Sequence, residues 1–384
     1  YAPEFFHRER HTPWGDAIAY ERQPVRQFFI ENALYWLEEF QLDGLRLDAI
    51  DNIVDDGSDE EILIELARRV RSEFPDRHIH LTTEDNRNIV RLHERGPGGE
   101  VQLYTGEWND DFHNVAHVVL TSEAEGYYED FTDQPWQKLA RAFAEGFVYQ
   151  GERSRHAGAA RGEPATHLPP TVFVDFLQNH DQVGNRALGE RLVKLVKEPR
   201  SYELIHAALI LSPHMPLLFM GEEYGETRPF LFFTDFRGEL ARAVRDGRRS
   251  EFAAFTGHAA DEIPDPNDVE TFRASKLDWA KIDAPAGRRA LARTRELLAL
   301  RRKHIVPLLA DRKSRAGSAV ASAEGAVAVD WRLGGAKLSL RLNLTAEPVE
   351  LPPAAGETIH ALGGKSEGDA AAPFSLVVTL DAAG

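Results

Sequence analysis

Three acidic residues stand at the ends of predicted β-strands, and their types and spacing could do chemistry. They are Asp48, Glu84 and Asp181. Converging carboxyl groups suit the cleavage of glycosidic bonds, because one can stay protonated and donate to the leaving oxygen while another attacks the anomeric carbon. Any one such acid is more often an N-cap or a loop hydrogen-bonding group, and converging acids can also bind a metal ion. Spacing alone therefore indicates a possible barrel hydrolase, and a purely structural role for these acids stays open.

The segment that ends at Asp48 has an alternating pattern. Side chains alternate between the faces of a strand, so Leu45 and Leu47 share one face while Arg46 and Asp48 share the other. An arginine beside Asp48 would keep its carboxyl group ionised, as a carboxylate nucleophile requires. Arg46 and Asp48 could equally form an ion pair with a structural role.

The next predicted strand ends in two adjacent acids, Glu84 and Asp85. Because neighbouring residues of a strand point to opposite sides, one of the two is the site residue. Glu84 shares a face with His80 and Thr82, opposite the apolar residues, and we therefore favour Glu84. Asp181 follows the strongest predicted strand.

Strands alternate with helices along the first 225 or so residues, which indicates a parallel sheet. This order fits a (β/α)₈ TIM-type barrel, of which the C-terminal five strands are present, or a doubly wound sheet. The predicted strands are residues 42–48, 78–84, 101–108, 171–177 and 215–220. The predicted helices are residues 24–40, 59–74, 133–149, 201–211 and 286–303.

The composition changes near residue 307, where short β-type runs lie between turns rich in glycine, proline and alanine. We predict a partial catalytic barrel with inserted loops over residues 1–306. A small all-β sandwich domain is expected over residues 307–384.

The overall composition narrows the classes of ligand. The chain has 384 residues and a net charge of −17, which disfavours nucleic acid and polyanionic substrates. It has no apolar run near the roughly 18 residues of a membrane span, so no membrane partner is predicted. Cysteine is absent, which excludes disulfides and thiolate chemistry and fits a cytoplasmic location.

The three acidic segments resemble the signature segments of the α-amylase superfamily of retaining glycoside hydrolases. They are Asp-Gly-Leu-Arg-Leu-Asp at 43–48, Thr-Glu-Asp at 83–85 and Gln-Asn-His-Asp at 178–181. The resemblance implies that Asp48 is the nucleophile, Glu84 the general acid/base and Asp181 the transition-state stabiliser. It implies that Arg46 orients Asp48 and that His180 binds sugar hydroxyls. Neither a metal nor a cofactor is predicted.

Four loop segments, at 11–18, 108–113, 179–191 and 220–225, are similar to one branch of that superfamily, the maltooligosyltrehalose trehalohydrolases. The resemblance implies hydrolysis of the α-1,4 bond beside the terminal trehalose of maltooligosyltrehalose or a related α-glucan. Retention of configuration is expected, with the two carboxyl groups ~5–5.5 Å apart. The alternatives are a 1,4-α-glucan branching transglycosylase and a non-catalytic glucan-binding protein.

Gln182, Trp14 and Trp108 lie in these matched segments and are the remaining candidates for substrate binding. Tryptophan can stack on sugar rings, although anchoring a core or a loop is at least as common. Asp51 stands where superfamily members commonly carry histidine, which alters the polarity expected beside the leaving group. The first three barrel strands and an N-terminal β-sandwich are expected upstream of Tyr1.

Overall fold

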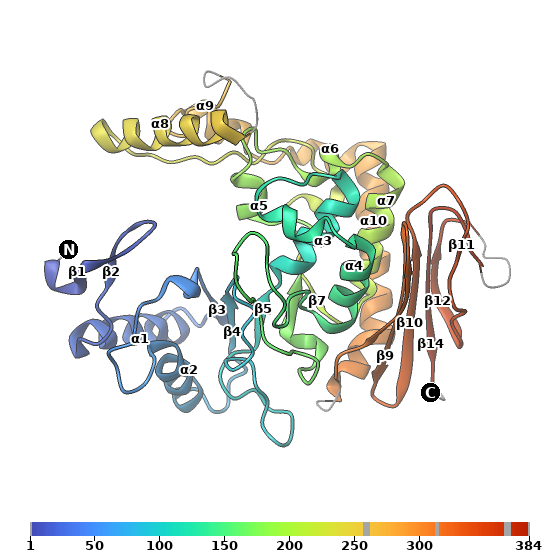
Figure 1. Cartoon of the computed structure of the whole chain (residues 1–384), viewed down its shortest axis with the longest axis horizontal. Coiled ribbons are helices and arrows are strands. Elements are labelled where there is room, and N and C mark those ends of the chain that lie inside the picture. The colour runs from blue at the N-terminus through green and yellow to red at the C-terminus, as the bar shows by residue number, and fades with distance from the viewer. Residues whose placement is uncertain (1, 256–261, 312–314, 365–369, 383–384) are drawn as a thin grey trace.

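The central element is an open parallel sheet of five strands, which confirms the predicted α/β class (Figure 1). The computed structural model describes residues 2–255, 262–311, 315–364 and 370–382. The strands pair in their chain order, all parallel. They are β3 (Gly44–Leu47), β4 (His80–Glu84), β5 (Gly106–Trp108), β6 (Phe173–Asp175) and β7 (Met215–Pro216).

Two glycines allow neighbouring strands of this sheet to lie close together. A Cβ atom at Gly44 would clash with the carbonyl oxygen of His80, and one at Gly106 would clash with that of Val172. Only glycine fits without shifting the neighbouring backbone at these positions.

Helices connect the strands and bury an apolar face against them. On α2, Leu63, Leu66 and Val70 are buried in one cluster with Leu81 of β4. These positions recur at helical spacing, and the helix falls within the predicted range of residues 59–74. The longer helices of this region are α1 (Gln23–Glu38), α2 (Ile62–Glu73), α3 (Asp110–Thr121), α4 (Pro135–Glu145), α7 (Pro199–Leu211) and α10 (Pro285–Leu300).

The helix α3 was not predicted. Nearly all of its residues are buried, including polar ones such as His113 and His117, so it lacks the polar face that marks a helix in a sequence. The side chain of Asn109 caps it by accepting a hydrogen bond from the backbone N–H of Phe112.

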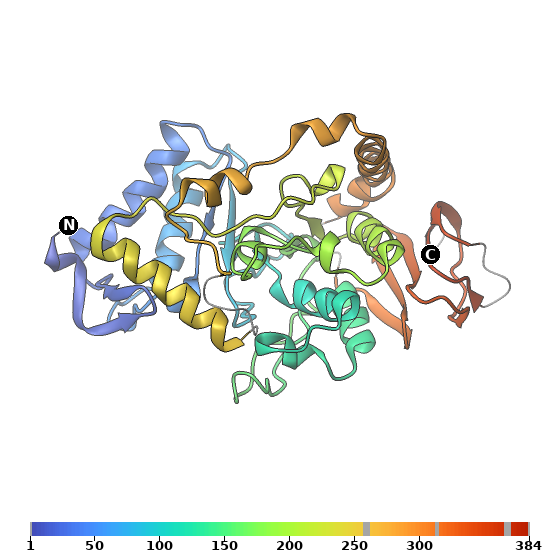
Figure 2. The same ribbon diagram turned by 90° about the horizontal axis from the view of Figure 1, so that it is seen from above.

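The remaining elements of this region lie in the loops. A hairpin of β1 (Phe6–Thr12) and β2 (Gly15–Ile18) carries Trp14 in its turn. In Figures 1 and 2, α8 lies at the same end of the molecule as this hairpin, and the C-terminal sheet lies at the opposite end. The short or peripheral segments are η1 (Pro3–Phe5), η2 (Ile50–Asn52), η3 (Gly126–Phe131), η4 (Pro170–Val172), α5 (His180–Gly184), α6 (Leu192–Leu195), η5 (Glu222–Tyr224), α8 (Gly238–Phe255), α9 (Val269–Ala274), η6 (Trp279–Asp283), η7 (Arg301–Ile305) and η8 (Val306–Ala310).

The C-terminal part is all-β, as predicted. An antiparallel sheet has the order β12-β14-β10-β9-β8, and a second sheet of two strands pairs β11 with β13. The side chain of Trp331 on β9 is buried and donates from Nε1 to the carbonyl oxygen of Phe143 on α4, at 3.1 Å. The strands are β8 (Ser318–Ala323), β9 (Ala326–Leu333), β10 (Ala336–Asn343), β11 (Val349–Glu350), β12 (Glu357–Leu362), β13 (Ala370–Ala371) and β14 (Ser375–Asp381).

One hydrophobic core joins the two parts. Leu340 on β10 and Val378 on β14 belong to the same buried cluster as Phe143 on α4 and Ile205 on α7. The β-sheet therefore packs on the helices of the parallel sheet through apolar contacts. Across the described ranges, no helix is long and apolar enough to cross a membrane.

Candidate active site

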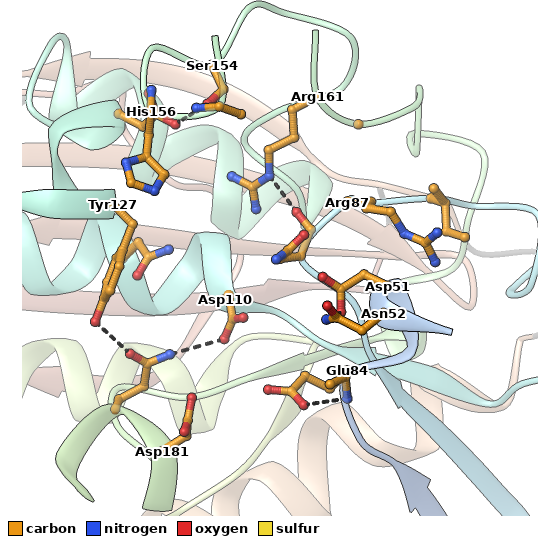
Figure 3. A pocket seen from close by; sticks show the side chains of 18 of the residues that line it. Asp51, Asn52, Glu84, Arg87, Asp110, Tyr127, Ser154, His156, Arg161 and Asp181 are labelled. Carbon is orange, nitrogen blue, oxygen red and sulfur yellow. Dashed lines mark hydrogen bonds between the residues drawn. The ribbon is translucent and has the colours of Figure 1, made fainter. Parts of the chain in front are cut away.

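A cavity of about 990 Å³ opens beside the carboxyl ends of the parallel strands (Figure 3). Three carboxyl groups predicted from the sequence line it together: Asp48, Glu84 and Asp181. The end of a parallel sheet where the strands' carboxyl termini meet is where α/β barrels build their active sites. Three further predicted residues, Trp14, His180 and Gln182, also line the cavity.

Arg46 holds two of these carboxyl groups at once. Its Nη1 lies 2.5 Å from Oδ1 of Asp48, and its Nη2 lies 2.9 Å from Oε2 of Glu84. The same Glu84 oxygen accepts a hydrogen bond of 2.9 Å from the backbone N–H of Ala49, the residue after Asp48. Ala49 has φ 45°, a left-handed conformation that turns the chain from β3 into η2. The predicted ion pair between Arg46 and Asp48 is thus present, and it extends to Glu84.

The surroundings move the pKa values of the two carboxyl groups in opposite directions. Partial burial acts to raise the pKa of Asp48, but the hydrogen bond and charge of Arg46 outweigh it and leave that pKa lowered. Burial raises the pKa of Glu84, and the charge of Asp48 adds to the rise against the opposing effects of Ala49 and Arg46. One carboxyl group is therefore suited to remain ionised and the other to carry a proton.

The adjacent acid, Asp85, has a different role from Glu84. It is buried and accepts two hydrogen bonds from the guanidinium group of Arg87, at 2.8 and 2.7 Å. Glu84 instead faces the cavity, because β4 alternates between Leu81 and Thr83 on the buried side and Thr82 and Glu84 on the other. The choice between the two acids made from strand alternation agrees with this placement.

Asp181 lies in the first turn of α5, beyond β6. The N-cap residue Asn179 accepts hydrogen bonds from the backbone N–H groups of Asp181 and Gln182, both at 2.9 Å. Asn185 donates to Oδ1 of Asp181 at 2.6 Å, one turn further along. This short capped turn directs Asp181 into the cavity opposite Glu84 (Figure 3).

The two candidate tryptophans are placed differently. Trp14 is 72% exposed at the rim of the cavity, in the hairpin turn. Trp108 is not among the residues that line the cavity, contrary to the expectation of a sugar-stacking residue. It lies under Arg46, with the guanidinium carbon 4.0 Å from the ring centroid, and its ring meets that of His180 edge-on at 5.9 Å.

Several lining residues were missed by sequence reasoning, among them Asp110, Tyr127, Arg87 and Arg161. Asp110 carried a usable signal, since it lies two residues after the end of a predicted strand, and the other three acids also lie at or shortly after strand ends. Tyr127 lies in η3, a segment for which no regular pattern was visible.

Asp51 also lines the cavity, within η2. Burial and the charge of Asp85 raise its pKa, against a hydrogen bond from Asn52. Within the part of the chain that the structure describes, no group of three or more His, Asp or Glu side chains is arranged to hold a metal ion.

The fold and the site define an α/β protein of the barrel type, with acidic side chains gathered where its parallel strands end. The chain belongs to the α-amylase family, because residues 4–288 match the family described as the alpha amylase catalytic domain. Residues 314–379 match a domain of unknown function, DUF3459.

Curated relatives bear a more specific name. A malto-oligosyltrehalose trehalohydrolase of Deinococcus radiodurans is 39% identical over 315 residues, covering 82% of this chain and 50% of the relative. One of Saccharolobus solfataricus is 38% identical over 279 residues, covering 72% of this chain and 47% of the relative. The chain thus spans about half the length of these curated relatives.

Solved structures agree with the fold. A Salmonella typhimurium protein provisionally called an alpha amylase superposes with a TM-score of 0.95 at 54% identity, covering 99% of this chain and 64% of that one. A pullulanase from Anoxybacillus sp. LM18-11, complexed with maltotetraose, superposes with a TM-score of 0.56 at 15% identity, covering 98% of this chain and 50% of its own. At that identity the pullulanase supports the fold alone.

Proposed function

We propose that the protein is a retaining glycoside hydrolase that cleaves the α-1,4-glucosidic bond next to the terminal trehalose of maltooligosyltrehalose and releases trehalose. The observation that carries the proposal is the bridge from Arg46 to both Asp48 and Glu84. It accompanies a lowered pKa on Asp48 and a raised pKa on Glu84. A nucleophile and a proton donor need these opposite states.

In the proposed mechanism Glu84 donates its proton to the glycosidic oxygen while ionised Asp48 attacks the anomeric carbon. The bond to the leaving sugar breaks, and a covalent glycosyl–Asp48 ester forms. Glu84, now ionised, accepts a proton from a water molecule that attacks the same carbon and releases Asp48. Asp181 binds hydroxyls of the distorted ring. Two inversions at one carbon give net retention.

The shared guanidinium supports retention. The two terminal nitrogens of Arg46 bring both carboxyl groups to one guanidinium group, which favours the ~5–5.5 Å of a retaining pair over the ~6.5–9.5 Å of an inverting pair.

The substrate is proposed from two supports. The names of the relatives at 36–39% identity point to maltooligosyltrehalose. A neutral oligosaccharide also fits a cavity with many hydrogen-bonding side chains in a chain of charge −17. We further propose a cytoplasmic location, and domains over residues 1–306 and 307–384.

Incubating the whole protein, expressed from its gene, with maltooligosyltrehalose tests the assignment. Trehalose should be the main small product, and proton NMR of the newly formed chain end should first show the α-anomer. Glu84→Gln should lower kcat about 10²- to 10⁴-fold, since it removes the proton donor. Asp48→Asn should abolish turnover. Products without trehalose would disprove the proposed specificity, and a β-anomer would disprove retention.

The rival reaction is transfer of the glycosyl group to a sugar hydroxyl, as in branching enzymes. Its support is a 35% identical stretch of 100 residues in a 1,4-alpha-glucan branching enzyme of Thiobacillus denitrificans, which covers 24% of this chain. New α-1,6 linkages in amylose treated with the protein would favour a branching enzyme. Glucan binding without turnover by the wild type would favour a non-catalytic glucan-binding protein.

A further inference from the structure

Asp110 is one of the carboxyl groups that line the cavity without a role in this mechanism. Asp110 begins α3, separated from β5 by Asn109 alone, and β5 lies between β4 and β6 in the sheet. The flanking strands lead to Glu84 and Asp181, and β3 leads to Asp48. Asp110 is therefore the acid that the fourth strand contributes at its carboxyl end (Figure 3).

The contacts of Asp110 differ from those of its neighbour Asp111. Asp111 is fully buried, and its Oδ2 accepts hydrogen bonds from the Asn88 side chain and the backbone N–H groups of Val148 and Tyr149, while Oδ1 pairs with Arg161 at 2.8 Å. These contacts explain Asp111 as a group that holds two loops together.

The side chain of Asp110 has one hydrogen-bond partner among the described residues. Its Oδ1 accepts from Nε2 of Gln182 at 3.3 Å. Among the residues that the structure describes, no Lys, Arg or His forms an ion pair with Asp110, and its Oδ2 has no hydrogen-bond partner. An acidic side chain in the first turn of α3 also suits the helix dipole, so the unpartnered Oδ2 is the feature that points to a ligand. A carboxyl oxygen that faces the cavity with no protein partner is placed to accept a hydrogen bond from a ligand.

Gln182 is in turn held by a second contact. The hydroxyl group of Tyr127 donates to Oε1 of Gln182 at 3.3 Å, so both ends of the amide are engaged (Figure 3). The chain Tyr127–Gln182–Asp110 joins η3, α5 and α3 along one wall of the cavity. It fixes Oδ1 of Asp110 and leaves Oδ2 free toward the interior.

We propose that Asp110 binds a hydroxyl group of the sugar in the cavity, and that Tyr127 and Gln182 are positioning residues that hold it in place. The identity of this ligand as an α-glucan rests on the function proposed above. The donor that suits Asp110 is a neutral hydroxyl, which a sugar supplies without a charge to be buried.

The charged groups around Asp110 determine its protonation state. Glu84 on β4, Glu107 on β5, Asp111 on α3 and Asp181 on α5 all face it, with Arg161 as an opposing cation. Burial, followed by these carboxyl groups, raises the pKa of Asp110 to about 7. Below pH 7 Asp110 is therefore largely protonated, so Asp110→Asn should leave the pKa of Glu84 and the basic limb of the rate profile in place.

The test compares Asp110→Asn with the wild type, both as the whole protein on the glucan that the wild type hydrolyses. We expect kcat/KM to fall about 3- to 10-fold, the size of a lost hydrogen bond between neutral groups. The basic limb of kcat/KM against pH should stay in place, because Glu84 ionises while Asp110 is still protonated. In an Asp48→Ala background, Asp110→Asn should weaken glucan binding about tenfold by calorimetry.

Tyr127→Phe is the second variant, since the side chain is exposed and its ring can stay in place. It should cost roughly 3- to 10-fold in kcat/KM through the loosened Gln182 amide. Tyr35→Phe, an exposed tyrosine on α1 away from the cavity, is the matched control and should change nothing.

Activity of Asp110→Asn within twofold of wild type would overturn the proposal. If that variant melts at a lower temperature, Tyr127→Phe decides: reduced activity supports the proposal and unchanged activity refutes it. A wild type that hydrolyses glucans without releasing trehalose would sink the proposed substrate alone. The effect of Asp110→Asn on that hydrolysis would still test Asp110.

Discussion

The guanidinium group of Arg46 lies over the indole ring of Trp108, 4.0 Å from its centroid. Arg46 comes from β3 and Trp108 from the end of β5, so the contact spans the intervening β4. Arg46 also pairs with Asp48 and Glu84. The indole ring of Trp108 thus contacts the guanidinium group of Arg46, which in turn pairs with the carboxyl groups of Asp48 and Glu84.

Replacing Trp108 with leucine should therefore lower kcat. A cation–π contact of about 0.5–2 kcal/mol corresponds to a roughly 2- to 30-fold loss of kcat/KM, with KM little changed. Trp14→Leu is the control, since its ring lies at the rim and should affect KM. Separate kcat and KM values for both variants check this. A raised KM with unchanged kcat for Trp108→Leu would contradict the supporting role.

Arg46→Gln should shift the pH dependence in a defined direction. Arg46 lowers the pKa of Asp48, which must be ionised to attack, and it also lowers the pKa of Glu84 against the effect of burial. Without the guanidinium both pKa values rise, so both limbs of kcat/KM against pH should move upward, the acidic one by about 1 unit or more. An acidic limb that stays in place in Arg46→Gln would show that other groups keep Asp48 ionised.

Gly44→Ala should destabilise the parallel sheet. The added Cβ would meet the carbonyl oxygen of His80 on the neighbouring strand, and such overpacking costs typically 1–3 kcal/mol in the free energy of unfolding. Gly247→Ala, in α8 with no atom close to the new methyl group, is the control and should gain about 0.5–1 kcal/mol. Urea unfolding of both variants measures the difference. Equal stability of the two would mean that β3 and β4 can move apart freely.

Trp331→Phe should weaken the attachment of the C-terminal sheet. It removes the hydrogen bond to the carbonyl oxygen of Phe143 inside the shared core, at a cost of about 1–3 kcal/mol in the free energy of unfolding. Trp279→Phe, at a side chain that is 64% exposed, should stay within about 0.5 kcal/mol of wild type. Fluorescence and circular dichroism should give coincident denaturant curves if one core unfolds as a unit. Two separate transitions in the wild type would show that the sheet and the helices unfold independently.

Much of the fold is visible in local patterns. Strand alternation selected Glu84 over Asp85, and the apolar positions of α2 match its buried face. The helix α3 was missed because its burial on nearly all sides erases the amphipathic pattern. The strand β12 lies at the sheet edge, and its residues are half-buried or exposed throughout, so its sequence lacks the apolar run of a buried strand.

The chain order and residue types were enough to place Asp48, Glu84 and Asp181 at strand ends, because side-chain direction and strand polarity follow from local geometry. Nothing local could show that Arg46 binds two carboxyl groups, that Trp108 lies beneath it, or that Asp110 faces the same cavity. These relationships join residues on separate strands. These contacts depend on the register between the strands and on the packing of the Trp108 ring under Arg46, and both are set by the tertiary packing of the whole fold.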